Sequence, residues 1–89
     1  MAETLVRYSK SALKFLSKRQ KRYVQIIREA IEGLTKQPPE GDIKPLAGYK
    51  DERFRLRVGK YRVIYRYDLD GALEVVYIID IGARGDIYK

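Results

Sequence analysis

The sequence predicts an α+β domain in which one strand and two short helices precede three further strands. Three observations predict this class. Apolar residues recur at helical spacing only between residues 10 and 34, apolar and basic residues alternate over 53–58, and tight-turn signals stand at 59–60 and 70–71. The expected order is β-α-α-β-β-β in a single domain of residues 1–89, with the helical hairpin packed on one face of a small, mainly antiparallel, twisted sheet.

The first strand and the first helix are predicted in the first fifth of the chain. Residues 3–9, ETLVRYS, favour a strand because apolar and aromatic side chains are frequent there. Ser9 is a suitable N-cap, since its hydroxyl can accept a hydrogen bond from a free backbone N–H of the first helical turn. A helix over 10–18 follows. Its apolar face is formed by Ala12, Leu13 and Leu16.

The second helix is the clearest periodic segment of the chain. It is predicted from about Gln20 to Leu34, with Arg28 and Glu32 on its outer side at i,i+4 spacing. Its apolar face is formed by Tyr23, Val24, Ile27, Ile31 and Leu34. Residues 35–48, TKQPPEGDIKPLAG, contain all three prolines of the chain, and we expect a loop there.

The second half of the chain predicts three strands joined by tight turns. Residues 53–58 alternate strictly, and the two-residue connection 59–60 has glycine first, as a type II′ turn requires. Residues 61–68 form the returning strand. After the turn at 70–71, residues 72–81 form a third strand that is apolar on both faces. Such a strand is expected at the centre of the sheet and covered on both faces.

The turn at Gly59 and Lys60 also predicts which residues face each other across the hairpin, because residues equally distant from the turn pair. On one face the predicted pairs are Phe54–Tyr65, Leu56–Val63 and Val58–Tyr61. On the other face they are Arg57–Arg62, Arg55–Ile64 and Arg53–Arg66. The first face is apolar and is expected to pack on the helices.

The arginine face is a feature that folding alone does not explain. Like charges directly opposite each other destabilise a ladder by about 0.2–1 kcal/mol per pair, and Thr or Gln would solvate the face equally well. A strand arginine is ordinarily a solvent-facing residue whose aliphatic stem covers apolar surface. Stacked arginine pairs in a chain of net charge +7 favour an anion site instead. Guanidinium forks suit the phosphates and bases of nucleic acid.

The composition excludes several kinds of chemistry. The chain has no His and no Cys, so imidazole or thiolate metal sites and Ser-His or Cys-His nucleophile pairs are impossible. We expect neither a metal nor another cofactor. No apolar run approaches the roughly 18 residues of a transmembrane helix, and the N-terminus lacks the pattern of a signal peptide. Without a disulfide framework, a cytoplasmic location is expected.

The C-terminal segment 81–89, IGARGDIYK, adds Arg84 and Tyr88 to the candidate residues. Gly82 and Gly85 bracket the arginine, so the backbone can turn there and aim its guanidinium at a neighbour. A tyrosine near a C-terminus commonly only packs, and these residues taken alone leave both interpretations open.

Nearly the whole chain resembles the RelE/ParE superfamily, the toxins of bacterial and archaeal type II toxin–antitoxin pairs. The likeness lies in the order of elements, in the L-x-G motif at 46–48, in the hairpin FRLRVGKYRVIY at 54–65 and in the closing IGARGDIY at 81–88. The resemblance implies one of two activities. RelE-like members are ribosome-dependent endoribonucleases that cut mRNA in the ribosomal A site, whereas ParE-like members poison DNA gyrase.

The resemblance to RelE-like members implies a set of site residues. Such members use two basic residues on the second strand, an arginine on the third, an arginine after the fourth and a C-terminal tyrosine. The matching positions here are Arg55, Arg57, Arg62, Arg84 and Tyr88. Because suitable residue types occupy all five, the ribonuclease branch is favoured. Further RNA contacts are expected from Arg53, Arg66 and Lys60.

The mechanism that these residues permit is metal-free attack by the 2′-OH of the RNA itself. Tyr88 is expected to take the 2′-OH proton, Arg62 and Arg84 to hold the non-bridging oxygens, and Arg55 with Arg57 to hold the flanking backbone and the leaving oxygen. The implied partners are a cognate antitoxin, the ribosome and mRNA. Promoter DNA would be contacted only indirectly, through the antitoxin.

Two other functions remain open on the sequence. One is gyrase inhibition of the ParE type, and the other is a non-catalytic module that binds RNA or the ribosome through the same basic face. A membrane-surface role is least favoured, because the charges lie on a strand face rather than along an amphipathic helix.

Overall fold

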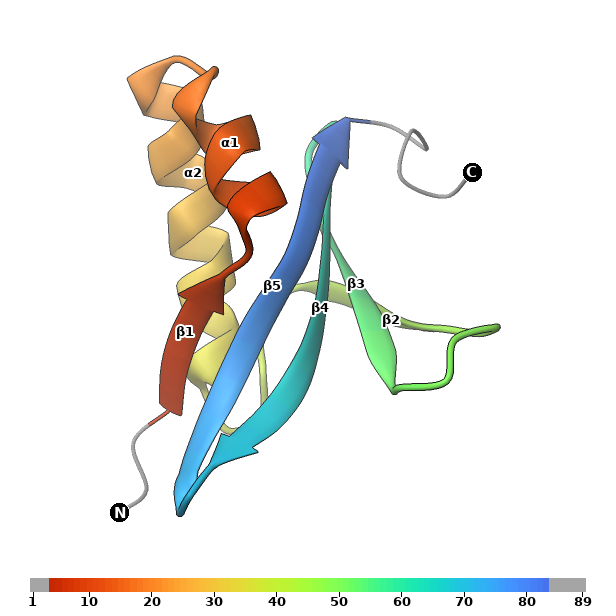
Figure 1. Ribbon diagram of the computed structural model, residues 1–89. Coiled ribbons are helices and arrows are strands. Elements are labelled where there is room, and N and C mark those ends of the chain that lie inside the picture. Colours follow the sequence, from red (N-terminus) through yellow and green to blue (C-terminus); the bar gives the residue numbers. More distant parts are fainter. Residues whose placement is uncertain (1–3, 84–89) are drawn as a thin grey trace.

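The computed structural model describes residues 4–83, which form two α-helices and five strands. In chain order these are β1 (Thr4–Tyr8), α1 (Lys10–Ser17), α2 (Lys21–Glu32), a 3-10 turn (Gly33–Thr35), β2 (Asp42–Leu46), β3 (Arg53–Val58), β4 (Tyr61–Asp70) and β5 (Leu73–Ala83). The strands form one sheet in the order β1-β5-β4-β3-β2, with β1 parallel to β5 and the other neighbours antiparallel. The predicted α+β class, with both helices on one face of the sheet, is confirmed (Figure 1).

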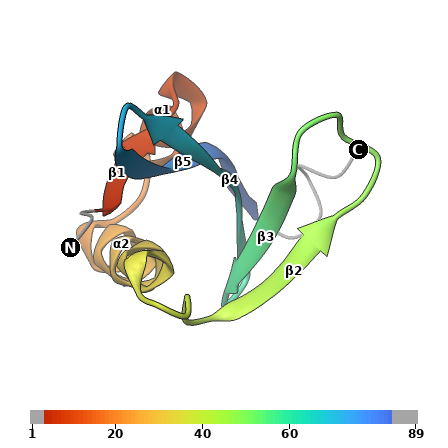
Figure 2. The ribbon, with the colours of Figure 1, turned by 90° about the horizontal axis from the view of Figure 1, so that it is seen from below.

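The sheet is twisted, and its two ends face different directions. Figure 2 shows β2 and β3 turning away from β1 and β5, with β4 between them. Helix α1 packs against β5, and α2 reaches β3. The helices therefore cover the middle of the sheet more fully than its β2 edge.

Strand β2 is an element that the sequence did not predict. Asp42–Leu46 pairs antiparallel with β3 at the edge of the sheet, whereas the sequence predicts a loop throughout 35–48. The prediction is wrong for these residues because the segment contains Pro45 and too few apolar residues to show a strand period. An edge strand tolerates proline, since one side of its backbone needs no partner in the sheet.

Strand β5 lies between β1 and β4, so its predicted central position is confirmed. The expectation of cover on both faces is wrong within the described residues, because both helices lie on one face (Figure 1). A β-bulge explains the misleading pattern. The register with β4 shifts so that Ile78 and Asp80 have partners and Ile79 has none. This shift lets apolar residues at odd and even positions reach the same core.

The hydrophobic core lies between the helices and the sheet. Its buried side chains are Ala12, Leu16, Ile27, Ile31, Leu34, Leu56, Tyr61, Val63, Tyr65, Val76, Ile78 and Ile81. Leu13, which the sequence predicts on the apolar face of α1, is 54% exposed. Phe15 packs against the core in its place, because it lies on the same side of the helix as the buried Ala12 and Leu16.

The predicted N-cap of α1 is confirmed and has a second role. Ser9 Oγ accepts a hydrogen bond from the backbone N–H of Ala12 over 3.1 Å. The same hydroxyl donates to the carbonyl oxygen of Ile79 over 2.6 Å. One side chain thus starts the helix and anchors it to the bulge of β5.

The β3–β4 hairpin has the predicted register close to its turn. The observed pairs are Phe54–Tyr65, Arg55–Ile64, Leu56–Val63, Arg57–Arg62 and Val58–Tyr61. Gly59 has a φ of 59°, which places it in the left-handed region that such a tight turn uses. The predicted Arg53–Arg66 pair is not part of the ladder: Arg53 faces Leu46 of β2, and Arg66 faces Tyr77 of β5.

Candidate functional site

The face of the sheet opposite the helices (the outer face) carries basic side chains on three neighbouring strands. Alternation along each strand and the register between strands place these side chains on the same face. They belong to Lys44 of β2, to Arg53, Arg55 and Arg57 of β3, and to Arg62 and Arg66 of β4. An anion that approaches β3 and β4 from this side therefore meets several guanidinium groups.

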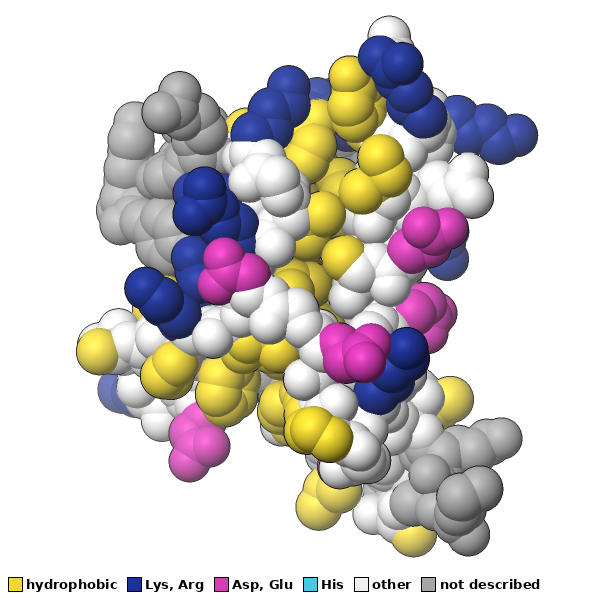
Figure 3. Space-filling view, turned by 180° about the vertical axis from the view of Figure 1, so that it is seen from behind, with side chains coloured by type: hydrophobic (Ala, Val, Ile, Leu, Met, Phe, Trp, Pro, Cys, Tyr) yellow, Lys and Arg dark blue, Asp and Glu magenta, His cyan; other side chains and the backbone are white. Residues whose placement is uncertain are grey.

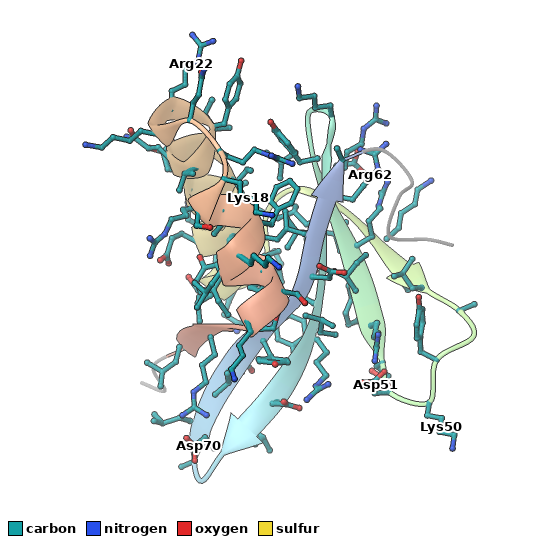
Figure 4. All side chains as sticks on the ribbon, turned by 45° about the horizontal axis from the view of Figure 1, so that its top comes forward. Lys18, Arg22, Lys50, Asp51, Arg62 and Asp70 are labelled. Carbon is teal, nitrogen blue, oxygen red and sulfur yellow. The ribbon has the colours of Figure 1, made fainter. Side chains whose placement is uncertain are left out.

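Arg57 and Arg62 form the centre of the candidate site. They are register partners, with Arg57 exposed and Arg62 half-buried. Arg62 Nη1 donates to two neutral groups, the carbonyl oxygens of Gly59 at 3.4 Å and Tyr61 at 3.3 Å. Among residues 4–83, neither guanidinium has a carboxylate within salt-bridge distance. Figure 4 shows Arg62 close to the end of β5. Within the described part of the chain, the charges of this pair are therefore uncompensated.

Arg55 is held differently from the central pair. Its Nη2 donates to Asp42 Oδ1 over 3.1 Å, and its side chain is only 12% exposed. Its Nε is buried and has no hydrogen-bond partner among the described residues. Arg55 therefore lies beneath the surface of the site, beside Arg57 and with its charge compensated by β2.

Arg53 and Arg66 share one carboxylate. Asp51, in the loop between β2 and β3, accepts from Arg53 Nε over 2.7 Å and from Arg66 Nη1 over 3.2 Å. The hydrogen bond from Arg53 lowers the pKa of Asp51. Arg66 also binds Asp68 over 3.1 Å. Both arginines are predicted RNA contacts, and each lies within salt-bridge distance of an acidic neighbour.

Lys60, a predicted RNA contact, lies in a second basic cluster whose other members the sequence analysis did not identify. Its ammonium lies 5.8 Å from the ring centroid of Tyr23 and 5.5 Å from that of Tyr61. These three residues line a pocket of about 290 Å³ together with Lys18 and Arg19 from the end of α1. In the sequence, the basic run KRQKR at 18–22 could have indicated this cluster. The fold brings the start of that run beside Lys60 in the turn of the β3–β4 hairpin.

Arg84 and Tyr88 lie outside the described residues. The described chain ends one residue beyond the register partner of Arg62. That partner is Gly82 of β5, and Ala83 is the last described residue. Arg84 follows Ala83 directly in the sequence.

Three tyrosines whose pKa is raised by burial are unsuited to act as bases. Burial raises the pKa of the phenols of Tyr8, Tyr65 and Tyr67, which all pack on the helix-facing side of the sheet. A raised pKa disfavours the tyrosinate that could accept a proton.

The described residues offer neither a metal cluster nor a membrane-spanning helix. No group of three or more carboxylates among residues 4–83 lies close enough together to hold a metal ion. Neither described helix has the length and apolar character to span a bilayer.

Comparisons with known proteins agree with this fold. A family model described as the ParE toxin of the type II toxin–antitoxin system, parDE, matches residues 6–88. Among curated proteins, none matches the chain.

Several solved structures are similar over nearly the whole chain. The archaeal RelE–RelB complex from Pyrococcus horikoshii OT3 contains a chain with 27% identity and a TM-score of 0.70, covering 94% of this chain and 98% of the other. The toxin–antitoxin complex RelBE2 from Mycobacterium tuberculosis gives 28% identity, a TM-score of 0.71, and coverage of 93% and 100%. The YoeB/ParE toxin from Agrobacterium tumefaciens, at 20% identity, shares the fold with a TM-score of 0.73 and coverage of 90% and 98%.

The family match extends over far more than half of the chain and includes every described helix and all of the described strands except the first residues of β1. The chain therefore belongs to the ParE toxin family of type II toxin–antitoxin systems, within the RelE/ParE superfamily.

Proposed function

We propose that this toxin is a ribosome-dependent endoribonuclease that cuts mRNA in the ribosomal A site. The observation that supports this most strongly is the Arg57–Arg62 pair. It combines two guanidiniums in register with the absence of a carboxylate partner for either among residues 4–83. A face meant only to be solvated would not keep this one arginine pair uncompensated while its neighbours are paired.

The substrate itself supplies the nucleophile. In RNA the 2′-OH attacks the adjacent phosphorus, the P–O5′ bond breaks, and the products carry a 2′,3′-cyclic phosphate and a 5′-OH. The protein must position the chain, remove the 2′-OH proton and stabilise the charge on the phosphoryl oxygens. A protein without His or Cys can do this with arginine and tyrosine.

Each residue of the expected set has a proposed role. Tyr88 takes the 2′-OH proton, and the leaving 5′-oxygen takes a proton from water, since arginine remains protonated. Arg62 and Arg84 bind the non-bridging oxygens as negative charge develops on them. Arg57 binds the flanking phosphate. Arg55, with its charge held by Asp42, supports the position of Arg57 and faces the leaving oxygen from below the surface.

The described end of β5 supports the inclusion of Arg84 and Tyr88. Ala83 is one residue beyond Gly82, the partner of Arg62. Tyr88 lies five positions after Ala83, and an extended chain spans at most about 18 Å over five residue steps. Both side chains are therefore within reach of the central pair.

The ribosome supplies the remaining requirement, which is a fixed conformation of the mRNA. A shallow outer face holds a flexible strand poorly, and prior alignment of the reacting groups contributes several kcal/mol to such a reaction. The proposed place of action is thus the cytoplasm, where translation takes place.

The proposed partner is a cognate antitoxin with an acidic, amphipathic segment. A groove of about 430 Å³ lies between α2 and the β3–β4 hairpin. It is lined by Tyr23, Ile26, Val58, Gly59, Lys60 and Tyr61. Figure 3 shows apolar side chains in a stripe along this side of the molecule, with basic side chains at its upper end. Apolar walls beside basic groups complement an acidic segment that folds as it binds. Two of the similar structures are toxin–antitoxin complexes.

A second candidate function is inhibition of DNA gyrase, and the description of the matching family model favours it. Such an inhibitor acts by binding a protein and needs no reactive centre on the outer face. Two assays separate the candidates: mRNA cleavage in a translation extract and supercoiling by purified gyrase.

The decisive experiment maps the 5′ ends of cellular mRNA after the toxin is induced, with and without its neighbouring antitoxin gene. We expect new 5′-OH ends at a constant position within codons, and we expect them to vanish when the antitoxin is co-expressed. Inhibited supercoiling with intact mRNA would establish the gyrase function instead. Binding to ribosomes without new ends would identify a non-catalytic module.

A further inference from the structure

The loop between β2 and β3, residues 47–52, presents an aromatic ring that has no role in the core. Tyr49 is 44% exposed and lies at the edge of the outer face. The guanidinium carbon of Arg53 lies 4.4 Å from the centre of its ring, which is a cation–π contact. Figure 4 shows this loop extending beyond the sheet, with Lys50 and Asp51 where it turns back to β3.

Arg53 is part of a fixed array rather than a free side chain. Asp51 holds Arg53 at 2.7 Å and Arg66 at 3.2 Å, and Arg66 in turn lies 4.9 Å from the ring centre of Tyr77. Each guanidinium therefore rests against a tyrosine ring, and one carboxylate joins the two. Side chains held in this way lose little further freedom when a flat ligand binds them.

The charge of this array indicates what kind of group it binds. Arg53 and Arg66 carry two positive charges, and Asp51 and Asp68 carry two negative charges within salt-bridge distance. The array is thus nearly neutral and offers a phosphate little attraction. It does offer flat, partly exposed surfaces, which suit the face of a nucleobase.

We propose that Tyr49 and Arg53 form a stacking platform for an unpaired base of the RNA substrate, separate from the phosphate-binding pair Arg57 and Arg62. This inference rests on the proposed function and adds the group that the loop recognises. Arg53 lies four residues from Arg57 along β3, which is about 13 Å. A single strand would therefore place a phosphate at the uncompensated end of β3 and a flanking base at its neutral end.

An acidic protein segment is a less suitable occupant of this loop. Such a segment needs uncompensated positive charge, and the two arginines here are already paired with Asp51 and Asp68. Within residues 4–83, uncompensated charge lies instead at Arg57 and Arg62.

The test is direct binding of a fluorescent single-stranded RNA oligonucleotide to the purified full-length toxin, compared with the same oligonucleotide carrying abasic residues. We expect Tyr49→Ala to weaken binding of the normal oligonucleotide by roughly 5- to 150-fold, the range of one base–aromatic stack. Tyr49→Phe keeps the ring and should bind like the wild type. Tyr49→Leu keeps apolar area without a π-face and should bind like Tyr49→Ala. The abasic oligonucleotide should bind the wild type and Tyr49→Ala equally.

Salt dependence distinguishes stacking from phosphate binding. Tyr49→Ala should leave the slope of affinity against salt unchanged, whereas Arg57→Ala should reduce it by about 0.7, the value for one phosphate contact of a single strand. Leu69→Ala, at a residue 78% exposed near the end of β4, is the surface control.

Two results would overturn the platform. Unchanged binding by Tyr49→Ala, together with the expected loss in Arg57→Ala, would remove the platform and leave the nuclease proposal standing. No binding of RNA by the wild type would also remove the platform, and cleavage of mRNA in a translation extract would then decide the nuclease proposal independently.

Discussion

The carboxylate of Asp42 accepts a hydrogen bond from Arg55 over 3.1 Å, although its partner in the β2–β3 register is Arg57. The side chain of Asp42 thus reaches diagonally along the ladder. The consequence is a division between these two arginines of β3 in charge compensation. One arginine is compensated and only 12% exposed, while Arg57 keeps an uncompensated charge among the described residues.

This division predicts the effect of Asp42→Asn. The amide no longer compensates Arg55, so a further positive charge becomes available on the outer face. We expect tighter binding of single-stranded RNA and a salt slope steeper by up to about 0.7. Asp70→Asn is the matched control, because it makes the same charge change beside Arg7 at the other edge of the sheet. An equal response of both variants would show that total charge, rather than the release of Arg55, sets the affinity.

Local sequence rules predicted the hairpin well because a single feature determines it. A two-residue turn with glycine first leaves one register in which the apolar residues of both strands share a face. The Arg57–Arg62 pair follows from that register. The N-cap at Ser9 was predictable for the same reason, since capping depends on residues three apart in the sequence.

The sequence could not predict which of the other arginines form salt bridges with acidic side chains. Asp51 and Asp42 come from a segment that shows no strand period, and their contacts with Arg53 and Arg55 exist only once β2 adds to the edge of β3. The bulge at Ile79 is likewise set by tertiary packing rather than by local preference. Sequence therefore identified the basic face, and the fold decides which of its charges remain free.

The proposed centre predicts the activity of three variants in a translation extract. Arg57→Ala and Arg62→Ala should each lower the rate of mRNA cleavage by about 10²–10³-fold, the usual cost of one donor to a charged transition state. Tyr88→Phe should lower it by about 10²–10⁴-fold, the contribution of a general base.

Arg28→Ala is the control for these variants, because Arg28 lies on α2 over the ring of Tyr8, away from the outer face. Circular dichroism should show native folds throughout. Full cleavage by Tyr88→Phe would eliminate the proposed base, and loss of activity in Arg28→Ala would show that general basicity matters more than the site.

The groove beside α2 predicts how antitoxin binding can be separated from folding. Ile26 is 53% exposed in this groove, so Ile26→Glu should fold normally while placing a negative charge where an acidic segment docks. We expect at least about a tenfold loss of affinity for the antitoxin in calorimetry, from lost apolar contact and like-charge repulsion. Leu13→Glu is matched in exposure, at 54%, but lies on α1 outside the groove. Similar losses in both variants would place the antitoxin elsewhere.

The buried tyrosines predict a loss of stability in alkali. Burial raises the pKa of Tyr65 far above the ordinary value of 10.0, and the neighbouring Tyr67 adds to the shift. Because the folded state holds this proton more tightly, the contribution to stability is fully present below pH 10 and is lost as the pH rises above it. Tyr65→Phe should therefore flatten the alkaline decline in the free energy of unfolding, measured by urea titration. Tyr49→Phe, at an exposed ring, is the control, and an equally steep decline in both would contradict the assignment.

The glycines that precede and follow β2 should respond unequally to replacement by alanine. Gly41 has a φ of 131°, and a Cβ there would lie 2.6 Å from Cδ1 of Leu56, which is 1% exposed and packed on all sides. Gly48 has a φ of 89° with no atom within 4 Å of the added Cβ, so Gly48→Ala introduces backbone strain without a clash. We expect Gly41→Ala to be less stable than Gly48→Ala by about 1–3 kcal/mol in urea denaturation, the usual cost of overpacking a core. Equal losses would mean that Leu56 can move aside, and the edge on which Asp42 meets Arg55 would then be far more adaptable than its packing indicates.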